Sequence, residues 1–283
     1  MGSCAGRGHE PRRLSLSTET FRQLERRSMI ALRNLSRRFE SSDGSVIQAL
    51  DSVNIEIGRH EFVSLVGPSG FGKSTLLRLI AGLLPPSSGE VEVGGEIVTT
   101  PRVDTGLVFQ SPTLLPWASI EENLLFPLRM LHRPVDAAAR QTASELLELV
   151  GLGGCAYKRP SELSGGMQQR AAICRALMHD PETLLMDEPF GALDALTREE
   201  MSLELLRICA ERPKTVVFVT HSIVEAVLLS DRVVVMSAGP GQVQEIIEIP
   251  MPRPRTFSME RKNDFQDRVE HIRGLIFGKP AVA

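Results

Sequence analysis

The sequence predicts an α/β domain in which a parallel sheet carries helices on both faces. Short apolar segments alternate with segments of helical spacing over much of the chain, which is typical of such sheets. A glycine-rich stretch at residues 67–75 lies between one such strand and one such helix. A mainly helical region at residues 111–179 interrupts the alternation, and it indicates a helical insertion within the α/β domain.

The individual elements follow from apolar spacing and from glycine and proline breakers. Residues 61–66 (EFVSLV) form a short, mainly apolar segment, which predicts a buried parallel strand. Val53, Ile55 and Ile57 alternate with other residues, which places them on one face of a strand. We expect Pro127 to interrupt the first helix of the insertion. The expected strands are residues 29–39, 46–57, 61–66, 90–93, 96–98, 105–109, 183–186, 214–220, 232–237 and 243–249; the expected helices are residues 75–82, 120–131, 136–150, 165–178, 195–210, 222–229 and 258–277.

The expected elements and the composition divide the chain into three regions. Residues 1–28 are polar and rich in Arg, Ser and Glu, which predicts a disordered N-terminal tail. Residues 29–249 are expected to form the main domain. Residues 250–283 begin with three prolines at alternate positions, which predicts a stiff linker before the last amphipathic helix.

Length and composition exclude several classes of protein. The chain has 283 residues and a formal net charge of −3, so its bulk charge does not indicate a nucleic-acid binder. Its four cysteines have no C-x-x-C spacing, which predicts reduced thiols and neither a disulfide framework nor a zinc site. No apolar run approaches the roughly 20 residues that span a bilayer, and we expect no secretory signal.

The stretch 67–75 matches G-x-x-x-x-G-K-[ST], a motif that binds nucleotide phosphates when it lies between a strand and a helix. Glycine lets the backbone N–H groups curl around a phosphate, and the following helix adds its positive N-terminal dipole. Lys73 supplies a positive charge for the β and γ phosphates, and the Ser74 hydroxyl is a hard ligand for Mg²⁺. The alternative is a glycine-rich turn without a ligand. The expected nucleotide contacts in this phosphate loop are Gly67, Pro68, Ser69, Gly70, Phe71, Gly72, Lys73, Ser74 and Thr75.

Two carboxylates follow the apolar segment 183–186. Ligands bind beyond the carboxyl ends of the strands in open α/β sheets, so we expect Asp187 beside the phosphate loop, where it would hold Mg²⁺ directly or through water. Glu188 is then placed to orient and polarise the attacking water. The alternative is a strand that ends in two solvated acids.

Gln110 and His221 also follow predicted strands. The Gln110 amide would reach Mg²⁺ or the attacking water, and the His221 imidazole would hydrogen-bond the γ-phosphate. Considered alone, Gln110 would more often be a capping or loop glutamine, and His221 would more often be a structural histidine at a strand end. Their occurrence together with the phosphate loop favours the functional roles.

A second potential anion site lies at residues 163–170, LSGGMQQR. Ser164 is typical of a helix N-cap, and Gly165 and Gly166 expose backbone N–H groups at the positive end of that helix. Because this site has no lysine, it suggests docking on a nucleotide held by another subunit. The alternative is a glycine-rich helix start with no ligand.

Together with residues 191–194 (GALD), these motifs occur in the order found in the ATPase subunits of ABC transporters, which the chain resembles over about residues 29–249. The resemblance implies a P-loop NTPase (RecA-like) core with a mixed sheet, an antiparallel β subdomain and an inserted helical subdomain. It also implies a head-to-tail homodimer that binds ATP and Mg²⁺. Each ATP would lie between the phosphate loop of one subunit and residues Ser164–Gly166 of the other, with Asp194 at the same interface.

Two aromatic positions are further points of comparison with the family. Phe39 matches the aromatic residue that stacks on adenine, where Tyr is commoner, and its phenyl face should contribute about 1–3 kcal/mol of stacking. Phe71 departs from the small residues that are usual at its position. Because only the backbone N–H is needed there, we expect little effect on ATP binding.

Residues 108–117 (VFQSPTLLPW) and the Pro-Arg tail at 250–255 look like those of the ATPases of nitrate, sulfonate, taurine and bicarbonate importers. This resemblance implies an importer ATPase on the cytoplasmic face of a bacterial membrane, working with a membrane permease and an external solute-binding protein, and not with nucleic acid. Trp117 would belong to the groove that receives a coupling helix of the permease. The alternative for Trp117 is a local packing cluster.

Two other functions compete with an importer ATPase. A soluble ABC-type ATPase of translation or DNA repair usually has two cassettes, a coiled-coil insertion or a basic arm, and none is visible in this sequence. A nucleotide-dependent regulator with little or no turnover is the other alternative. The presence of Lys73, Asp187, Glu188 and His221 argues against lost chemistry.

Overall fold

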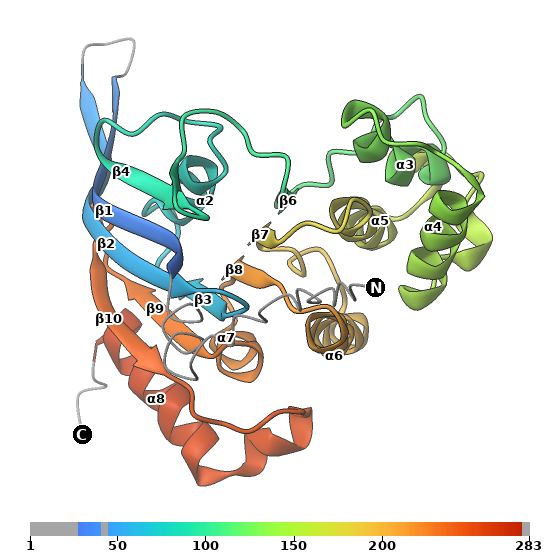
Figure 1. Cartoon of the computed structure of the whole chain (residues 1–283). Helices are drawn as coiled ribbons and strands as arrows, with labels where there is room; N and C mark the ends of the chain where they lie inside the picture. Colours follow the sequence, from blue (N-terminus) through green and yellow to red (C-terminus); the bar gives the residue numbers. More distant parts are fainter. Residues whose placement is uncertain (1–27, 41–44, 279–283) are drawn as a thin grey trace, which may run out of the picture.

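The computed structural model describes residues 28–40 and 45–278 and contains two sheets (Figure 1). The predicted N-terminal tail therefore lies outside the described residues, except for Ser28. Within the described ranges, no helix combines the length and the apolar character needed to cross a membrane.

The larger sheet has six strands in the order β10-β9-β3-β8-β7-β6. These strands are β3 (Phe62–Val66), β6 (Thr105–Val108), β7 (Thr183–Asp187), β8 (Thr215–Val219), β9 (Arg232–Met236) and β10 (Val243–Glu248). All pair in parallel except β10, which is antiparallel to β9 and forms one edge. Every residue of β3, β7 and β8 is buried, so this part of the sheet is covered on both faces, as their continuous apolar sequences predict.

The described helices include seven α-helices: α2 (Lys73–Ile80), α3 (Ile120–Met130), α4 (Ala137–Leu149), α5 (Gly165–Leu177), α6 (Ala195–Glu211), α7 (Ile223–Leu229) and α8 (Asn263–Phe277). Figure 1 shows α3, α4 and α5 grouped to one side of the sheets, between β6 and β7 in the chain. Buried Leu124, Leu147 and Ala171 join these three helices in one apolar cluster. They lie within the predicted insertion at residues 111–179, whose bounds as a separate domain stay a prediction.

The smaller sheet is antiparallel, with the strand order β2-β1-β4-β5. Its strands are β1 (Ser28–Glu40), β2 (Val46–Gly58), β4 (Ser88–Val93) and β5 (Glu96–Ile97). Val53, Ile55 and Ile57 are buried, which confirms the alternation predicted for β2. They share an apolar cluster with Leu76 of α2 and Leu185 of β7, so α2 and both sheets pack on a common core.

Two helix starts differ from the sequence prediction. Helix α2 begins at Lys73 and not at Thr75, because Gly72 has left-handed backbone angles and ends the loop before Lys73. The last helix begins at Asn263, and residues 257–261 form a short 3-10 helix instead. Lys262 separates the two with an extended backbone (φ −80°, ψ 141°), which a continuous helix does not allow.

The prediction that Pro127 interrupts a helix is wrong, because α3 continues through it to Met130. Proline removes one backbone donor from this last part of the helix. The buried side chains of Leu124 and Leu128 keep the surrounding turns packed against the core, and this tertiary packing outweighs the local preference.

Arg255 attaches the segment after β10 to the core. Its guanidinium group is buried and donates hydrogen bonds of 2.6–3.3 Å to five main-chain carbonyl oxygens, those of Val227, Leu228, Ser230, Ile249 and Met251. Helix α7 ends at Leu229, so the first two carbonyls belong to its last turn, where helical partners are missing. Burial lowers the pKa of Arg255 to about 10, which leaves the group charged at neutral pH.

Replacing Arg255 with Met should lower the free energy of unfolding by about 3 kcal/mol, because buried carbonyl groups lose a charged donor. Arg253→Met is the matched control. The Arg253 side chain is 38% exposed and pairs with Asp231, so its removal should lower the free energy of unfolding by less than about 1 kcal/mol. Urea denaturation followed by circular dichroism measures both effects. Equal losses in the two variants would contradict the role given to Arg255.

Candidate functional site

The phosphate loop connects β3 to α2 with the backbone geometry that its glycines permit. Gly72 has φ +85°, and a Cβ atom there would lie 2.5 Å from Leu50 Cδ2 and 2.6 Å from the carbonyl oxygen of Ala49. Gly67 is similarly confined, because a Cβ atom would lie 2.5 Å from the carbonyl oxygen of Met236. Both positions therefore require glycine, and the loop is fixed against β2 and β9 from two sides.

Lys73 is buried at the first position of α2. Its ammonium group donates hydrogen bonds to the carbonyl oxygens of Gly67 (2.8 Å) and Pro68 (2.5 Å). Burial lowers the pKa of Lys73, and the nearby carboxylates of Glu188 and Asp187 oppose that shift. The ammonium group is thus held inside the phosphate loop, close to the acids at the end of β7.

Asp187 ends β7 and accepts a hydrogen bond from the Ser74 hydroxyl at 2.9 Å. Burial is the main cause that raises the pKa of Asp187, and the Ser74 bond partly opposes it. A hydroxyl and a carboxylate oxygen this close together form a donor set that suits Mg²⁺. No group of three or more His, Cys, Asp or Glu side chains that could hold a metal occurs among residues 28–40 and 45–278, so phosphate or water oxygens would have to complete the coordination.

Glu188 lies one residue further along and contacts two other strand ends. The His221 Nε2 atom is 2.5 Å from Glu188 Oε1, and the Gln110 amide donates to Glu188 Oε2 at 3.2 Å. Glu188 has φ +47°, an uncommon conformation for a residue with a side chain and one that is often found at functional sites. The loops after β6, β7 and β8 therefore meet at one carboxylate.

A cavity of about 280 Å³ lies between these residues. Its lining consists of Ser69, Gly70, Phe71, Gly72, Lys73, Ser74, Thr75, Gln110, Glu188 and His221. The structure thus brings together most of the phosphate loop with Gln110, Glu188 and His221, three of the residues that the sequence predicts at strand ends. Asp187 lies beside them through its bond to Ser74.

Phe39 does not line this cavity. It is half-buried on β1 opposite Ile47, and the guanidinium of Arg37 lies 4.7 Å from its ring centre. Adenine stacking on Phe39 therefore stays a prediction. Phe71 does line the cavity, and its ring fills space beside Gly239, where a Cβ atom would be 2.9 Å from Phe71 Cε1. Gly239 belongs to the loop between β9 and β10, and no short-range motif links it to the phosphate loop.

The second predicted anion site is separate from the cavity. Ser164 caps α5 by accepting a hydrogen bond from the backbone N–H of Met167 at 3.3 Å, which confirms its expected N-cap geometry. Apart from its chain neighbours and the nearby backbone of its own helix, no described atom would approach a Cβ atom at Gly165 within 4 Å, whereas one at Gly166 would lie 3.2 Å from Leu193 Cδ2. This helix start is therefore open to the outside on one side and packed against residues 191–194 on the other.

Asp194 caps α6, because its carboxylate accepts a hydrogen bond from the backbone N–H of Thr197 at 3.0 Å. That bond lowers the pKa of Asp194, so the group is charged at neutral pH. Its side chain is exposed and does not line the phosphate-loop cavity. Ser164 does not line that cavity either, so the contact of both residues with a nucleotide held by a second copy of the chain stays a prediction.

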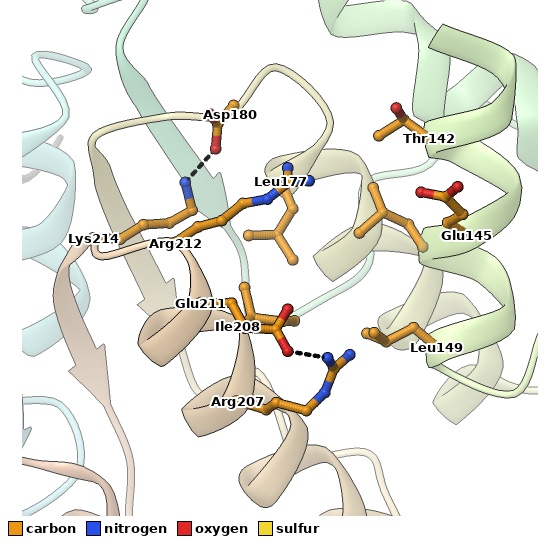
Figure 2. Close-up of a pocket in the computed structure, with 11 residues that line it drawn as sticks. Thr142, Glu145, Leu149, Leu177, Asp180, Arg207, Ile208, Glu211, Arg212 and Lys214 are labelled. Atoms are coloured by element: carbon orange, nitrogen blue, oxygen red, sulfur yellow. Dashed lines mark hydrogen bonds and ion pairs between the residues drawn. The ribbon is translucent and has the colours of Figure 1, made fainter. Parts of the chain in front are cut away.

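A different cavity, of about 250 Å³, lies between α4 and α6 (Figure 2). Leu149 and Ile208 contribute apolar surface, and the ion pairs Lys214–Asp180 and Arg207–Glu211 lie around them. It shares no residue with the phosphate-loop cavity. This is where the helical group meets α6, and the ion pairs are satisfied within the chain.

Trp117 is 72% exposed, so the structure does not place it in a packed local cluster. Tyr157, which the sequence analysis did not single out, is 88% exposed. Residues 156 and 158 hydrogen-bond the backbone of residues 121 and 120, which brings the loop of Tyr157 close to the start of α3. The two exposed aromatic residues therefore flank the same region of the helical group.

The fold and the phosphate-loop cavity together define an α/β protein built to hold the phosphates of a nucleotide. The family description "ABC transporter" matches residues 50–191. Two relatives extend the match. The chain is 45% identical to the taurine import ATP-binding protein TauB of Roseobacter denitrificans, over 88% of this chain and 94% of the relative. It is 48% identical to the bicarbonate transport ATP-binding protein CmpC of a Synechocystis species, over 80% of this chain but only 34% of that longer relative.

A solved structure gives the same result. The ATP-binding cassette MJ0796, in a dimeric post-hydrolysis state bound to ADP and Pi, is 35% identical and has a TM-score of 0.72. The match covers 79% of this chain and 100% of that one. The chain therefore belongs to the ABC transporter family, and its core, antiparallel sheet and helical group have the arrangement of an ABC ATPase cassette.

The raised pKa of Asp187 has a consequence for stability. In the folded protein this carboxyl binds its proton more tightly than in the unfolded chain, so stability is lost as the pH rises from the ordinary value of 3.8 through the folded pKa. Without nucleotide or Mg²⁺, Asp187→Asn should therefore unfold at a higher temperature than the wild type at pH 7. At a pH well below 3.8 the difference should shrink.

The same variant should lose Mg²⁺-dependent ATP turnover by a factor on the order of 10² or more. Thermal unfolding between pH 3 and pH 8 and a phosphate-release assay measure the two effects. Ser64→Ala, a buried hydroxyl change on β3 of the same sheet, is the control for general perturbation of the sheet. A less stable Asp187→Asn protein at pH 7 would contradict the conclusion that burying the charged Asp187 carboxylate destabilises the folded protein.

Proposed function

We propose that this chain is the ATP-hydrolysing subunit of an ABC importer. The single observation that best supports this function is the meeting of Gln110, Glu188 and His221 at the mouth of the phosphate loop. Each comes from a different strand end of a cassette whose family is established. A fold that only bound nucleotide would not need a carboxylate held at that point by two partners.

The proposed chemistry is phosphoryl transfer to water, in which positioning and electrostatics do most of the catalysis. The backbone N–H groups of the phosphate loop and the Lys73 ammonium would bind the β and γ phosphates. Ser74, Asp187 and Gln110 would hold Mg²⁺, which when bound neutralises charge on the phosphate oxygens. Glu188 would orient and polarise the attacking water, and His221 would donate to the γ-phosphate. Phe39 would stack on adenine.

The proposed active form is a head-to-tail dimer. In each site, Ser164, Gly165 and Gly166 of the second subunit would contact the γ-phosphate held by the first, and Asp194 would lie at the same interface. This arrangement accounts for a helix start that is open on one side. The dimeric cassette among the solved structures supports it.

The proposed cellular setting is the cytoplasmic face of a bacterial membrane, beside a permease and an external solute-binding protein. Exposed Trp117 and Tyr157 would belong to the surface that the permease contacts. The solute would be a small anion or organic solute of the nitrate, sulfonate, taurine or bicarbonate type, in keeping with the names of TauB and CmpC.

Ser164→Arg should leave ATP binding to the isolated subunit within about twofold of the wild type and abolish hydrolysis, because the substitution blocks only the contact with the second subunit's nucleotide. Glu188→Gln is the informative comparison, since it should bind ATP, form the dimer and turn over more slowly by a factor of about 10² to 10⁴. Fluorescent-nucleotide titration, size-exclusion chromatography and phosphate release separate the two variants. Normal hydrolysis by Ser164→Arg would count against a shared site.

Importer function itself is tested by expressing the tagged full-length chain in its native host and purifying it from detergent extracts. We expect a stoichiometric partner with several membrane spans, identified by mass spectrometry. Trp117→Arg together with Tyr157→Ser should reduce recovery of that partner at least about tenfold, because aromatic anchors contribute much of the binding free energy at such surfaces. A chain that purifies with ribosomes or DNA-repair proteins and no membrane partner would favour the soluble alternative.

A further inference from the structure

Glu225 is a buried carboxylate on the first turn of α7, four residues after His221 in the chain. It does not line the phosphate-loop cavity. Its Oε2 atom accepts a hydrogen bond from the Thr220 hydroxyl at 2.6 Å, and Thr220 Oγ1 accepts one from the Ser222 N–H at 3.0 Å. Because Thr220 and Ser222 are the two neighbours of His221, Glu225 restrains the backbone on both sides of that residue.

Helix capping alone does not explain this arrangement. Ser222 caps α7 by accepting a hydrogen bond from the Glu225 N–H at 3.2 Å. In an ordinary capping box the glutamate would return a bond to the N–H of the capping residue. Here the Ser222 N–H donates to the Thr220 hydroxyl instead, and that hydroxyl donates to Glu225 Oε2. The other carboxylate oxygen, Oε1, faces a different helix.

That helix is α6, and the group that faces Glu225 is the guanidinium of Arg198. Arg198 Nε lies 3.6 Å from Glu225 Oε1, and another Arg198 nitrogen donates to the carbonyl oxygen of Leu193 at 3.3 Å. The Arg198 Nε atom is buried and has no hydrogen-bond partner among the described residues. A shift of about 0.5 Å would bring it within hydrogen-bond distance of Glu225. A small movement of either side chain would therefore form a direct hydrogen bond between Arg198 and Glu225.

Leu193 connects Arg198 to the second anion site, because its side chain packs against Gly166 at the start of α5. Leu193 lies in the segment 191–194, which starts three residues after Glu188. His221 is thus joined to this segment twice. One connection runs through Glu188 and the main chain, and the other through Thr220, Glu225 and Arg198.

We propose that Arg198 and Glu225 are positioning residues that couple the position of His221 to the segment 191–194 and to Gly166. The inference rests on the proposed ATPase function. A γ-phosphate that engages His221 moves Thr220 and the start of α7, and Glu225 then closes on Arg198. Arg198 in turn positions Leu193 and, through it, the helix start that the second subunit's nucleotide contacts. The state of one nucleotide site thereby affects the geometry of the other.

The test uses Glu225→Gln and Arg198→Gln in the full-length chain. Gln at position 225 keeps the size and an acceptor for Thr220 but removes the charge that faces Arg198. We expect each variant to lower kcat about tenfold, because catalytic geometry is displaced, and to leave the Kd for ATP of the isolated subunit within about twofold. The double variant should lose no more than the more impaired single variant, because both residues act through one contact.

Two controls separate positioning from general stability. Arg207→Gln with Glu211→Gln removes an exposed ion pair from the same helix α6 and should keep the wild-type kcat. Thr220→Val should reproduce the loss of kcat, and Thr220→Ser, which restores the hydroxyl, should recover most of it. Thermal unfolding of every variant is measured alongside. A role in stability alone would lower the melting temperature without this pattern of recovery.

A wild-type kcat in Glu225→Gln and Arg198→Gln would overturn the coupling. So would a double variant whose loss equals the product of the two single losses. If Glu225→Gln fails to fold, Arg198→Gln and the Thr220 pair decide the question by the same criteria. Absence of ATPase activity in the wild-type chain would instead count against the proposed function, so the two failures are distinguishable.

Discussion

The parallel pairing of β3 with β8, and of β8 with β7, brings three strand ends to one edge of the larger sheet. Leu65 and Asp187 both pair with Val219, so the loops that follow these strands start side by side. A shift of either register by one residue would move each side chain to the opposite face. Because every residue of these strands is buried, burial alone does not fix the register, and packing specific to each position does, such as the contacts of Phe218 with Phe62 and Phe190. The position of every charged group in the cavity depends on this register.

The sequence was sufficient for the parts of the site that depend on local pattern. Lys73 belongs to a motif that follows one apolar run, and Glu188 comes directly after another, so the topology of a parallel sheet places them together. The contact between Arg198 and Glu225 has no such signal, because the residues lie on different helices and meet only through packing. The S-x-x-E spacing of Ser222 and Glu225 marks a helix start but not the partner. The start of α8 was missed for a similar reason, since the extended conformation of Lys262 is a property of the packed chain.

The electrostatic character of the cavity reflects a balance between burial and function. Burial disfavours the charged forms of both Lys73 and Asp187, since it lowers the pKa of the first and raises that of the second. Their proximity to each other and to Glu188 works against this for the lysine. The positive φ of Glu188 adds local backbone strain at the same point. Such features are typical of sites in which stability is sacrificed so that charges are in place before a ligand arrives.

The contact between Phe71 and Gly239 has a consequence for anyone who recombines parts of this cassette with parts of another. The ring occupies the space that a side chain at position 239 would need, so the two positions must be inherited as a pair. A chimera that combined Phe71 with a bulkier residue at position 239 would force either the ring or the β9–β10 loop to move. The reverse chimera, with a small residue at position 71, would leave a void beside the phosphate-loop cavity. Crossover points in this protein should therefore keep residues 71 and 239 on the same parental sequence.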